Sequence, residues 1–398
     1  MELKTTTAME YCKFVTDGTH DSPKAKDNGF KLITSKHLKR YEIDFNNANY
    51  ISEEDYKKVI ERSSVEQWDI LFSMIGTIGN IYIETNSNIN YACKNMGIFK
   101  LGGDEMKSKW LYYYLQSPKA IEYIGAVSRG TTQGYVPLGA LRQIPVDIIE
   151  NNNRNAIVSF LWNLDEKIKN NIEINNNLSK QIKTICTAWL SDYAPFGGVL
   201  PDDWSKTSLS SIADFVSGYS YKGTELTESN IAMATIKNFD RKGGFKLDGY
   251  KEIVPSGKLK DTQHAELFDT LVAHTDLTQN AEVIGNAEPV MSKSGYSDIV
   301  FSMDLVKVVP KNKHISKFLI AAILQDKNFK AHCLGYVNGT TVLHLSKKAL
   351  SEYQLYLPNE LSALKPLDEL VTVLYSRFLL TLKKLLNLKP YVMLFYQS

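Results

Sequence analysis

The sequence repeats its own landmarks about 200 residues apart, and this internal repeat constrains the fold more than any other feature. Similar short segments recur in the same order: Phe14-Val15 and Phe215-Val216, Lys36-His37 and Lys237-Asn238, Asp69–Ser73 and Asp269–Ala273, and Gly130-Thr131-Thr132 and Gly339-Thr340-Thr341. Their offsets are 201, 201, 200 and 209 residues. One such match can arise by chance, but an ordered series with a slowly drifting offset predicts two copies of one structural plan.

Each copy combines a mixed front part with a helical tail. Short apolar runs broken by glycine, asparagine and aspartate, as in 69–79 and 297–310, are typical of strands and turns. Helices are expected between such runs, for example over 107–116 and 315–325. The front parts therefore predict an α/β (α+β) fold.

Both tails carry the alternating four- and three-residue spacing of a coiled-coil seam. The seam of the first tail contains Ile157, Leu161, Leu164, Ile168, Leu178, Ile182, Ile185 and Trp189. Adding 210 gives the seam of the second tail: Leu367, Val371, Leu374, Phe378, Leu388, Val392 and Phe395. Two matching seams favour an antiparallel coiled coil, with helices of roughly 50 Å at 1.5 Å per residue. The alternative is that each helix packs only on its own domain.

Polar residues interrupt the seams near their middle. Asn171 and Asn175 stand in the first tail, and Thr381 and Leu385 match them in the second. A polar seam residue can fix helix register at some cost in stability. Pro390 lies inside the second tail, where a proline is expected to kink or end a helix.

A segment dense in proline and glycine, residues 194–201, separates the two copies and predicts a linker. The expected organisation is a mixed domain over 1–150, a long helix over 151–192, the linker over 193–201, a second mixed domain over 202–360 and a second helix over 361–398.

Composition narrows the class of protein. With 43% hydrophobic and 23% charged residues, the chain reads as a folded domain protein. Neither a membrane-spanning run nor a secretory leader is recognisable. The four cysteines are scattered, and only His332 and Cys333 stand together among potential zinc ligands. A cytoplasmic protein with reduced thiols is expected. The net charge of +2 neither requires nor excludes nucleic acid.

With the repeat in view, the chain resembles the specificity subunits of type I restriction-modification systems over nearly its whole length. Four segments carry the resemblance: Val15–Pro23, Asp69–Gly79, Arg129–Pro145 and Leu200–Trp204. Each is a loose match, so the specificity lies in their order and duplication. Two departures occur. Val342-Leu343-His344 replaces Gln133-Gly134-Tyr135 in the second copy, and the first copy lacks a Leu-Pro-x-x-Trp lead-in.

The resemblance implies two target-recognition domains, each followed by a conserved helix, and helices that pair as an antiparallel spacer. It implies a non-catalytic chain without a cofactor of its own, because S-adenosylmethionine belongs to the two methyltransferase subunits that such a chain binds. A restriction subunit can join that complex. Each domain then reads one half of a bipartite double-stranded DNA target, with the two readers about one helical turn, roughly 34 Å, apart.

Candidate DNA contacts lie on polar loops, because base readout needs donors and acceptors and phosphates need basic groups. The Gly-Thr-Thr segments give Arg129, Thr131, Thr132, Gln133 and Tyr135 in the first copy and Asn338, Thr340, Thr341 and His344 in the second. Further loops give Thr19, His20, Lys36, His37, Tyr219, Tyr221, Lys222, Lys237 and Asn238. The alternative is that these segments are structural turns or solvated loops.

Charged residues outside these loops have separate expected roles. A basic stretch containing Arg241, Lys242, Lys246 and Lys251 is expected to face phosphates. Asp69 and Asp269 are expected to be structural and to accept hydrogen bonds from turn N–H groups.

Two other functions stay open. Glu105-Met106-Lys107 matches the Glu-x-Lys fragment of some metal-dependent nucleases, with Asp69 as a conceivable partner, but the second copy has no equivalent. The long helices would also suit a coiled-coil adaptor without sequence readout. The polar loops that recur in both copies argue against the adaptor.

Overall fold

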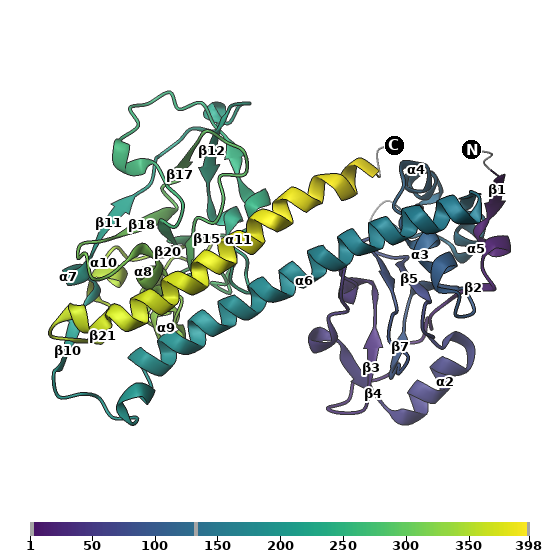
Figure 1. Cartoon of the computed structure of the whole chain (residues 1–398), viewed down its shortest axis with the longest axis horizontal. Coiled ribbons are helices and arrows are strands. Elements are labelled where there is room, and N and C mark those ends of the chain that lie inside the picture. The colour runs from purple at the N-terminus through teal and green to yellow at the C-terminus, as the bar shows by residue number, and fades with distance from the viewer. Residues whose placement is uncertain (1–3, 131–133, 396–398) are drawn as a thin grey trace. The chain divides into compact units, whose positions relative to one another are not determined.

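A computed structural model describes residues 4–130 and 134–395, with the backbone alone for 389–395. The chain divides into two compact units (Figure 1). The first unit contains residues 1–171 and 384–398, and the second contains residues 172–383.

The first unit is built on a four-stranded antiparallel sheet of order β2-β8-β5-β6. A three-stranded sheet of order β4-β3-β7 and the pair β1-β9 complete it. Its strands are β1 Lys4–Thr7, β2 Phe14–Asp17, β3 Phe30–Ile33, β4 Asn49–Ile51, β5 Ile70–Ser73, β6 Ile81–Ile83, β7 Tyr91–Cys93, β8 Met96–Lys100 and β9 Pro145–Ile148. Its helices are α1 Ala8–Tyr11, α2 Glu53–Ser63, α3 Glu105–Tyr114, α4 Pro118–Val127, α5 Leu138–Arg142 and the first half of α6 Asn151–Leu190.

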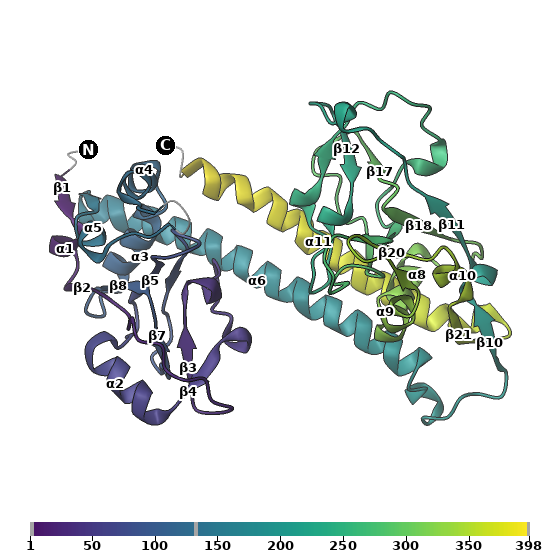
Figure 2. The same cartoon turned by 180° about the vertical axis from the view of Figure 1, so that it is seen from behind.

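The second unit repeats this topology (Figure 2). Its sheets have the orders β11-β18-β14-β16, β13-β12-β17 and β10-β21, with a further sheet β15-β20-β19. The strands are β10 Trp204–Ser208, β11 Ala213–Ser217, β12 Ile231–Ala234, β13 Lys251–Glu252, β14 Thr270–Ala273, β15 Thr275–Asp276, β16 Ala287–Pro289, β17 Asp298–Phe301, β18 Leu305–Pro310, β19 Val337–Asn338, β20 Leu343–Leu345 and β21 Gln354–Pro358. The helices are the second half of α6, α7 Leu209–Ile212, α8 Lys317–Leu324, α9 Lys327–Leu334, α10 Lys348–Glu352 and, up to Lys383, α11 Lys365–Phe395.

The internal repeat predicted from the sequence is confirmed by this topology. In both units the first strand pairs antiparallel with the strand that precedes the long helix, β1 with β9 and β10 with β21. The first copy therefore has this strand even though it lacks the Leu-Pro-x-x-Trp lead-in. The mixed α/β character and the helices expected near 107–116 and 315–325 are also present, as α3 and α8.

A shared turn explains why Asp69 and Asp269 recur. Trp68 and Phe268 have positive φ values of 70° and 67°, a conformation that non-glycine residues rarely adopt. In each turn the aspartate that follows this residue accepts a hydrogen bond from the backbone N–H of a glutamate. The donor is Glu66 in the first unit, at 2.8 Å, and Glu266 in the second, at 3.0 Å. The structural role predicted for both aspartates is confirmed.

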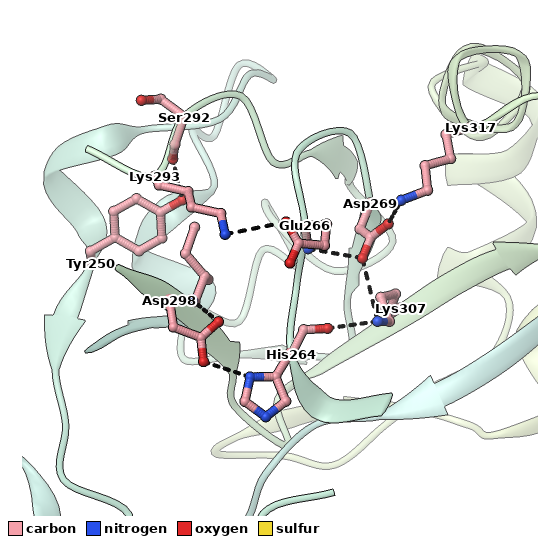
Figure 3. A network of polar contacts seen from close by, with 10 residues as sticks. Tyr250, His264, Glu266, Asp269, Ser292, Lys293, Asp298, Lys307 and Lys317 are labelled. Carbon is pink, nitrogen blue, oxygen red and sulfur yellow. Dashed lines mark hydrogen bonds and ion pairs between the residues drawn. The ribbon is translucent and has the colours of Figure 1, made fainter. Parts of the chain in front are cut away.

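Each of these carboxylates also holds a lysine of the central sheet. Lys100 Nζ lies 2.8 Å from Asp69, and Lys307 Nζ lies 3.3 Å from Asp269, where Lys317 approaches to 2.5 Å (Figure 3). The pairs are largely buried, so each one ties the turn to a neighbouring strand through an ion pair that would be costly to break.

A glycine in each unit is required by close packing. A Cβ atom on Gly18 would lie 2.4 Å from the Cys93 carbonyl oxygen, and one on Gly218 would lie 2.1 Å from that of Ser302. Since these gaps are too small for any side chain, glycine alone lets the loop after β2 or β11 run against the neighbouring strand end.

The long helix α6 packs on the first unit through its first half. Leu161 belongs to the core that includes Ile70, Phe72 and Phe99. Asp165 is buried and accepts hydrogen bonds at 3.0 Å from the hydroxyls of Tyr41 and Tyr113. These contacts confirm, for this part of α6, the packing on its own domain that the sequence left as an alternative.

In the second unit, one hydrophobic cluster contains residues of both long helices. Leu178 and Ile182 of α6 share it with Leu367 and Val371 of α11. The Thr381 hydroxyl donates a hydrogen bond to Asn175 Oδ1, so two polar seam residues named from the sequence are partners. Pro390 was expected to kink or end the second helix. It does not end the helix, because α11 continues to Phe395.

Two general features bear on the class of protein. All four cysteines are buried and unpaired. Among the residues that the structure describes, none of the helices has both the length and the apolar character needed to cross a membrane.

Candidate nucleic-acid interface

Strand direction gathers the candidate loops of the first unit at one edge of its central sheet. β2 and β5 both run antiparallel to β8, so their carboxyl ends lie beside its start. The loop with Thr19 and His20 follows β2, and Thr19 forms a bridge with Lys94 just before β8. Ile75, which follows β5, forms a bridge with Tyr135. Two candidate segments that are more than 100 residues apart therefore share one edge.

A hairpin stands at this edge in the first unit. Arg129 and Tyr135 exchange backbone hydrogen bonds of 2.9 and 2.8 Å. Gly130 has a φ of 96°, which glycine adopts without steric cost. The side chains of Arg129 and Tyr135 are exposed. The candidates Thr131, Thr132 and Gln133 lie outside the described residues.

The second unit builds the same hairpin from β19 and β20. Asn338 pairs with His344, and Gly339 has a φ of 107°. Thr275 pairs with His344 as Ile75 does with Tyr135. The candidate side chains of this hairpin are all exposed: Asn338, Thr340, Thr341 and His344.

The two hairpins thus share their backbone and differ in their side chains. Arg129 and Tyr135 of the first occupy the places of Asn338 and His344 in the second. Arginine matches the acceptors of guanine and asparagine matches adenine in the major groove. One backbone scaffold that carries different side chains at matched positions suits the recognition of two different DNA sequences.

The loop after β2 is braced by a charged network. His20 is exposed and contacts Asp17 and Asn95, each at 2.9 Å through one ring nitrogen. Buried Asp17 also pairs with exposed Arg62. Thr19 is half-buried and lines a surface groove together with Arg62 and Lys58. Arg62 and Asn95 were not among the residues predicted from the sequence.

The corresponding loop of the second unit is held by a buried tyrosine. The Tyr219 hydroxyl donates to Glu225 at 2.8 Å and accepts the Gly257 N–H at 3.0 Å. With 6% of its surface exposed, Tyr219 supports the loop from inside and does not present its ring to solvent. Lys222 is exposed, and Tyr221 is half-buried with Lys251 Nζ 5.9 Å from its ring centre.

His37 and Asn238 are buried, with 3% and 0% exposure, and each closes its own loop. His37 accepts the Thr34 N–H at Nδ1 (3.0 Å) and donates from Nε2 to the Asn47 carbonyl (3.1 Å). Asn238 accepts the Thr235 N–H (2.9 Å) and donates to the Lys246 carbonyl (2.8 Å). Burial lowers the pKa of His37 and keeps Nδ1 free to accept. These two side chains are not carried into the interface, whereas neighbouring Lys36 and Lys237 are exposed.

The matched roles of His37 and Asn238 predict an asymmetric tolerance to mutation. His37→Asn should cost less than about 1 kcal/mol, because asparagine offers the same acceptor and donor. His37→Ala should cost about 2–3 kcal/mol, because a buried N–H and a buried carbonyl lose their partners. Urea denaturation of the two variants checks this prediction. Equal losses of stability would contradict it.

The basic stretch is spread over a wide surface. Arg241 pairs with Glu282 at 3.0 Å and lines a pocket with Lys242, Lys183 and Lys327. Lys246 is exposed and Lys251 is half-buried. The sequence did not indicate that Lys183, from α6, joins this group.

The residues of the nuclease alternative are engaged elsewhere. Asp69 is fully buried against Lys100, and Glu105 pairs with Lys109 at 2.5 Å. His332 contacts the Ala349 carbonyl at 2.8 Å through Nε2, and Cys333 is buried. Across 4–130 and 134–395 no group of three His, Cys, Asp or Glu side chains is placed to hold a metal ion.

Comparison with known proteins points to one family. Residues 24–183, which make up less than half of the chain, match the model of the type I restriction modification DNA specificity domain. This match supports a role in DNA recognition. Neither the nuclease nor the adaptor alternative gains support.

Solved structures share the fold. The S subunit of a Type-I restriction-modification system from M. genitalium aligns with 100% of this chain and 95% of its own, at a TM-score of 0.61 and 15% identity. The HsdS subunit from Thermoanaerobacter tengcongensis covers 98% of this chain and 95% of its own (TM-score 0.33, 12% identity). A type I R-M system structure covers 99% and 96% (TM-score 0.38, 13% identity). The last two are too distant to support an argument. No curated protein matches the sequence.

Proposed function

We propose that this protein is the DNA-reading subunit of a type I restriction-modification complex. Each of its two units then reads one half of a bipartite double-stranded DNA target. The observation that carries the proposal is the hairpin-bearing edge built twice with different side chains at matched positions. The proposed contacts are the candidates whose side chains are exposed or half-buried: Thr19, His20, Lys36, Arg129 and Tyr135 in the first half, and Tyr221, Lys222, Lys237, Arg241, Lys242, Asn338, Thr340, Thr341 and His344 in the second. Thr131, Thr132 and Gln133, which lie outside the described residues, are proposed with them.

Helices α6 and α11 are proposed to pair antiparallel and to set the gap between the half-sites. The bond between Thr381 and Asn175 supports this pairing, because a buried polar contact fixes one register. The shared cluster of Leu178, Ile182, Leu367 and Val371 supports it as well. Two readers on one side of B-DNA would then stand about one turn, roughly 34 Å, apart.

Two methyltransferase subunits, which would carry S-adenosylmethionine, are proposed to dock on the helices, and a restriction subunit can join them in the cytoplasm. Phe160 and Leu370 lie outside the seams, at matching positions of the two long helices 210 residues apart. They expose 57% and 42% of their surface. Large apolar side chains exposed at matched positions suit two copies of one partner. An apolar side chain exposed without a function would not be expected to recur at the same position of both helices.

The test is a map of methylated bases across the host genome, with the gene intact, deleted, or replaced by the double variant Phe160→Asp, Leu370→Asp. We expect methylation of one bipartite motif with a constant gap, lost in the deletion and in the double variant. The purified double variant should still bind motif DNA. An unchanged map in the deletion strain, with the methyltransferase expressed and active, would refute the proposal.

A further inference from the structure

The second unit carries one extra residue at the edge where the candidate loops meet. In the first unit, Cys93 accepts the N–H of Thr19, and Met96, three residues later, pairs with Ser73. In the second unit, Phe301 accepts the N–H of Tyr219, and Leu305, four residues later, pairs with Ala273. The turn is therefore one residue longer in the second unit, and the added residue lies between Met303 and Leu305. It is Asp304.

A second difference lies beside the first. Met74 follows β5 in the first unit, is 5% exposed and belongs to the apolar core. His274 stands at the equivalent place after β14, and its backbone N–H donates to the Asp304 carbonyl at 2.8 Å. The two differences thus place His274 and Asp304 next to each other, joined through their backbones, where the first unit has a methionine and a shorter turn.

These residues line a groove of about 460 Å³ at the base of the second hairpin. Ser217, His344 and Lys347 line it as well, and the side chains of His344 and Lys347 are exposed. Met303 exposes 57% of its surface beside Asp304. The volume falls within the range of ligand sites, roughly 300–1,000 Å³. A groove of this size accommodates a nucleobase edge.

One ring nitrogen of His274 has no partner within the part of the chain that the structure describes. Its Nε2 atom is buried and makes no hydrogen bond to any of those residues. Burial lowers the pKa of His274 to about 4, so the ring is neutral at neutral pH and offers one donor and one acceptor. Because the χ2 torsion of histidine is broad and roughly two-fold, the ring can turn either nitrogen toward the groove. A partner supplied by a ligand would remove the cost of this unpaired group.

We propose that this groove reads a base in the half-site of the second unit, with His274 and Asp304 as specificity-determining residues. The proposal rests on the function proposed above. A carboxylate only accepts hydrogen bonds, so Asp304 selects a base that presents an exocyclic amino group in the major groove, which is adenine or cytosine. His274 supplies the second contact, and His344 and Lys347 hold the adjoining backbone.

The test compares methylation motifs of the complete complex carrying wild-type chain, Asp304→Ala or His274→Met. Alanine removes the carboxylate without adding atoms or a new base contact, and methionine is the residue of the first unit at that place, so both variants should fold. We expect preference for adenine or cytosine to fall about 10-fold or more at one position of the second half-site. The identity of that position distinguishes the two bases. The first half-site should not change.

Glu228→Gln, at an exposed acid of the same unit outside the groove, is the matched control and should leave the motif intact. A wild-type motif that persists unchanged in both folded groove variants would overturn this inference alone. Absence of any bipartite motif with the wild-type chain would overturn the proposed function together with it.

Discussion

Replacing Asp269 with alanine is expected to destabilise the second unit by about 3–5 kcal/mol, the usual cost of removing one partner of a buried ion pair. The Asp269 side chain is 9% exposed and faces Lys307, which is 10% exposed. Without the carboxylate, the Lys307 ammonium stays buried with no opposite charge at hand, since its other bond is to the His264 carbonyl (Figure 3). The Glu266 N–H of the strained turn also loses its acceptor.

Urea denaturation gives the size of this effect, and hydrogen exchange of peptides from β14 and β18 assigns it to the second unit. Asp214→Ala is the control, because its carboxylate is 66% exposed and its pair with Lys311 should contribute less than about 1 kcal/mol. The double change Asp269→Leu, Lys307→Met should recover much of the loss, since no buried charge is left unpaired and Lys317, whose side chain is 45% exposed, can be solvated. A loss no larger than that of Asp214→Ala would show that the pair does not hold the turn.

Asp69 and its counterpart Asp269 also show why much of the fold could be predicted from the sequence. Asp69 and Asp269 recur in sequence because both units need an acceptor for the same turn, so the repeat reports a structural requirement directly. The helical seams were readable for a similar reason, since the spacing of Leu161, Ile168 and Ile182 follows from helix geometry. Local chemistry and periodicity are properties that a sequence displays without its tertiary contacts.

The candidate site was less predictable, because burial depends on distant partners. His37 and Asn238 follow an apolar strand, which suits a loop tip, yet their partners are the carbonyls of Asn47 and Lys246, ten and eight residues onward. Tyr219 is likewise turned inward by Glu225 and Gly257. A polar residue after a strand can cap its loop or face solvent, and the sequence pattern is the same in both cases.

Asp304 and His274 were not recognised in the sequence for another reason. Landmark matching tolerates a drifting offset, so one inserted residue is absorbed in the drift from 200 to 209. The pairing of Ser73 with Met96 and of Ala273 with Leu305 fixes where the insertion lies. Strand register, unlike sequence offset, identifies Asp304 as an addition and His274 as its neighbour.

Gly339→Ala is expected to weaken specific DNA binding by the complex roughly 100-fold, or about 3 kcal/mol, the value of one or two base-pair readouts. Gly339 has a φ of 107°, and a Cβ atom there would lie 2.3 Å from the Val342 carbonyl oxygen across the hairpin. The backbone must move to relieve this contact. That movement displaces the exposed side chains of Asn338, Thr340, Thr341 and His344 together, whereas the phosphate contacts of other loops are kept.

Gly295→Ala separates this effect from simple backbone strain. Gly295 also has a positive φ, 89°, but a Cβ atom there meets nothing within 4 Å and the residue lies outside the hairpin. Both variants should lose about 1–2 kcal/mol of stability from the left-handed conformation, while only Gly339→Ala should lose affinity for motif DNA over unrelated DNA. Fluorescence anisotropy at fixed salt measures both affinities. Equal losses in the two variants would place sequence reading elsewhere, because a displaced hairpin would then matter no more than a strained surface turn.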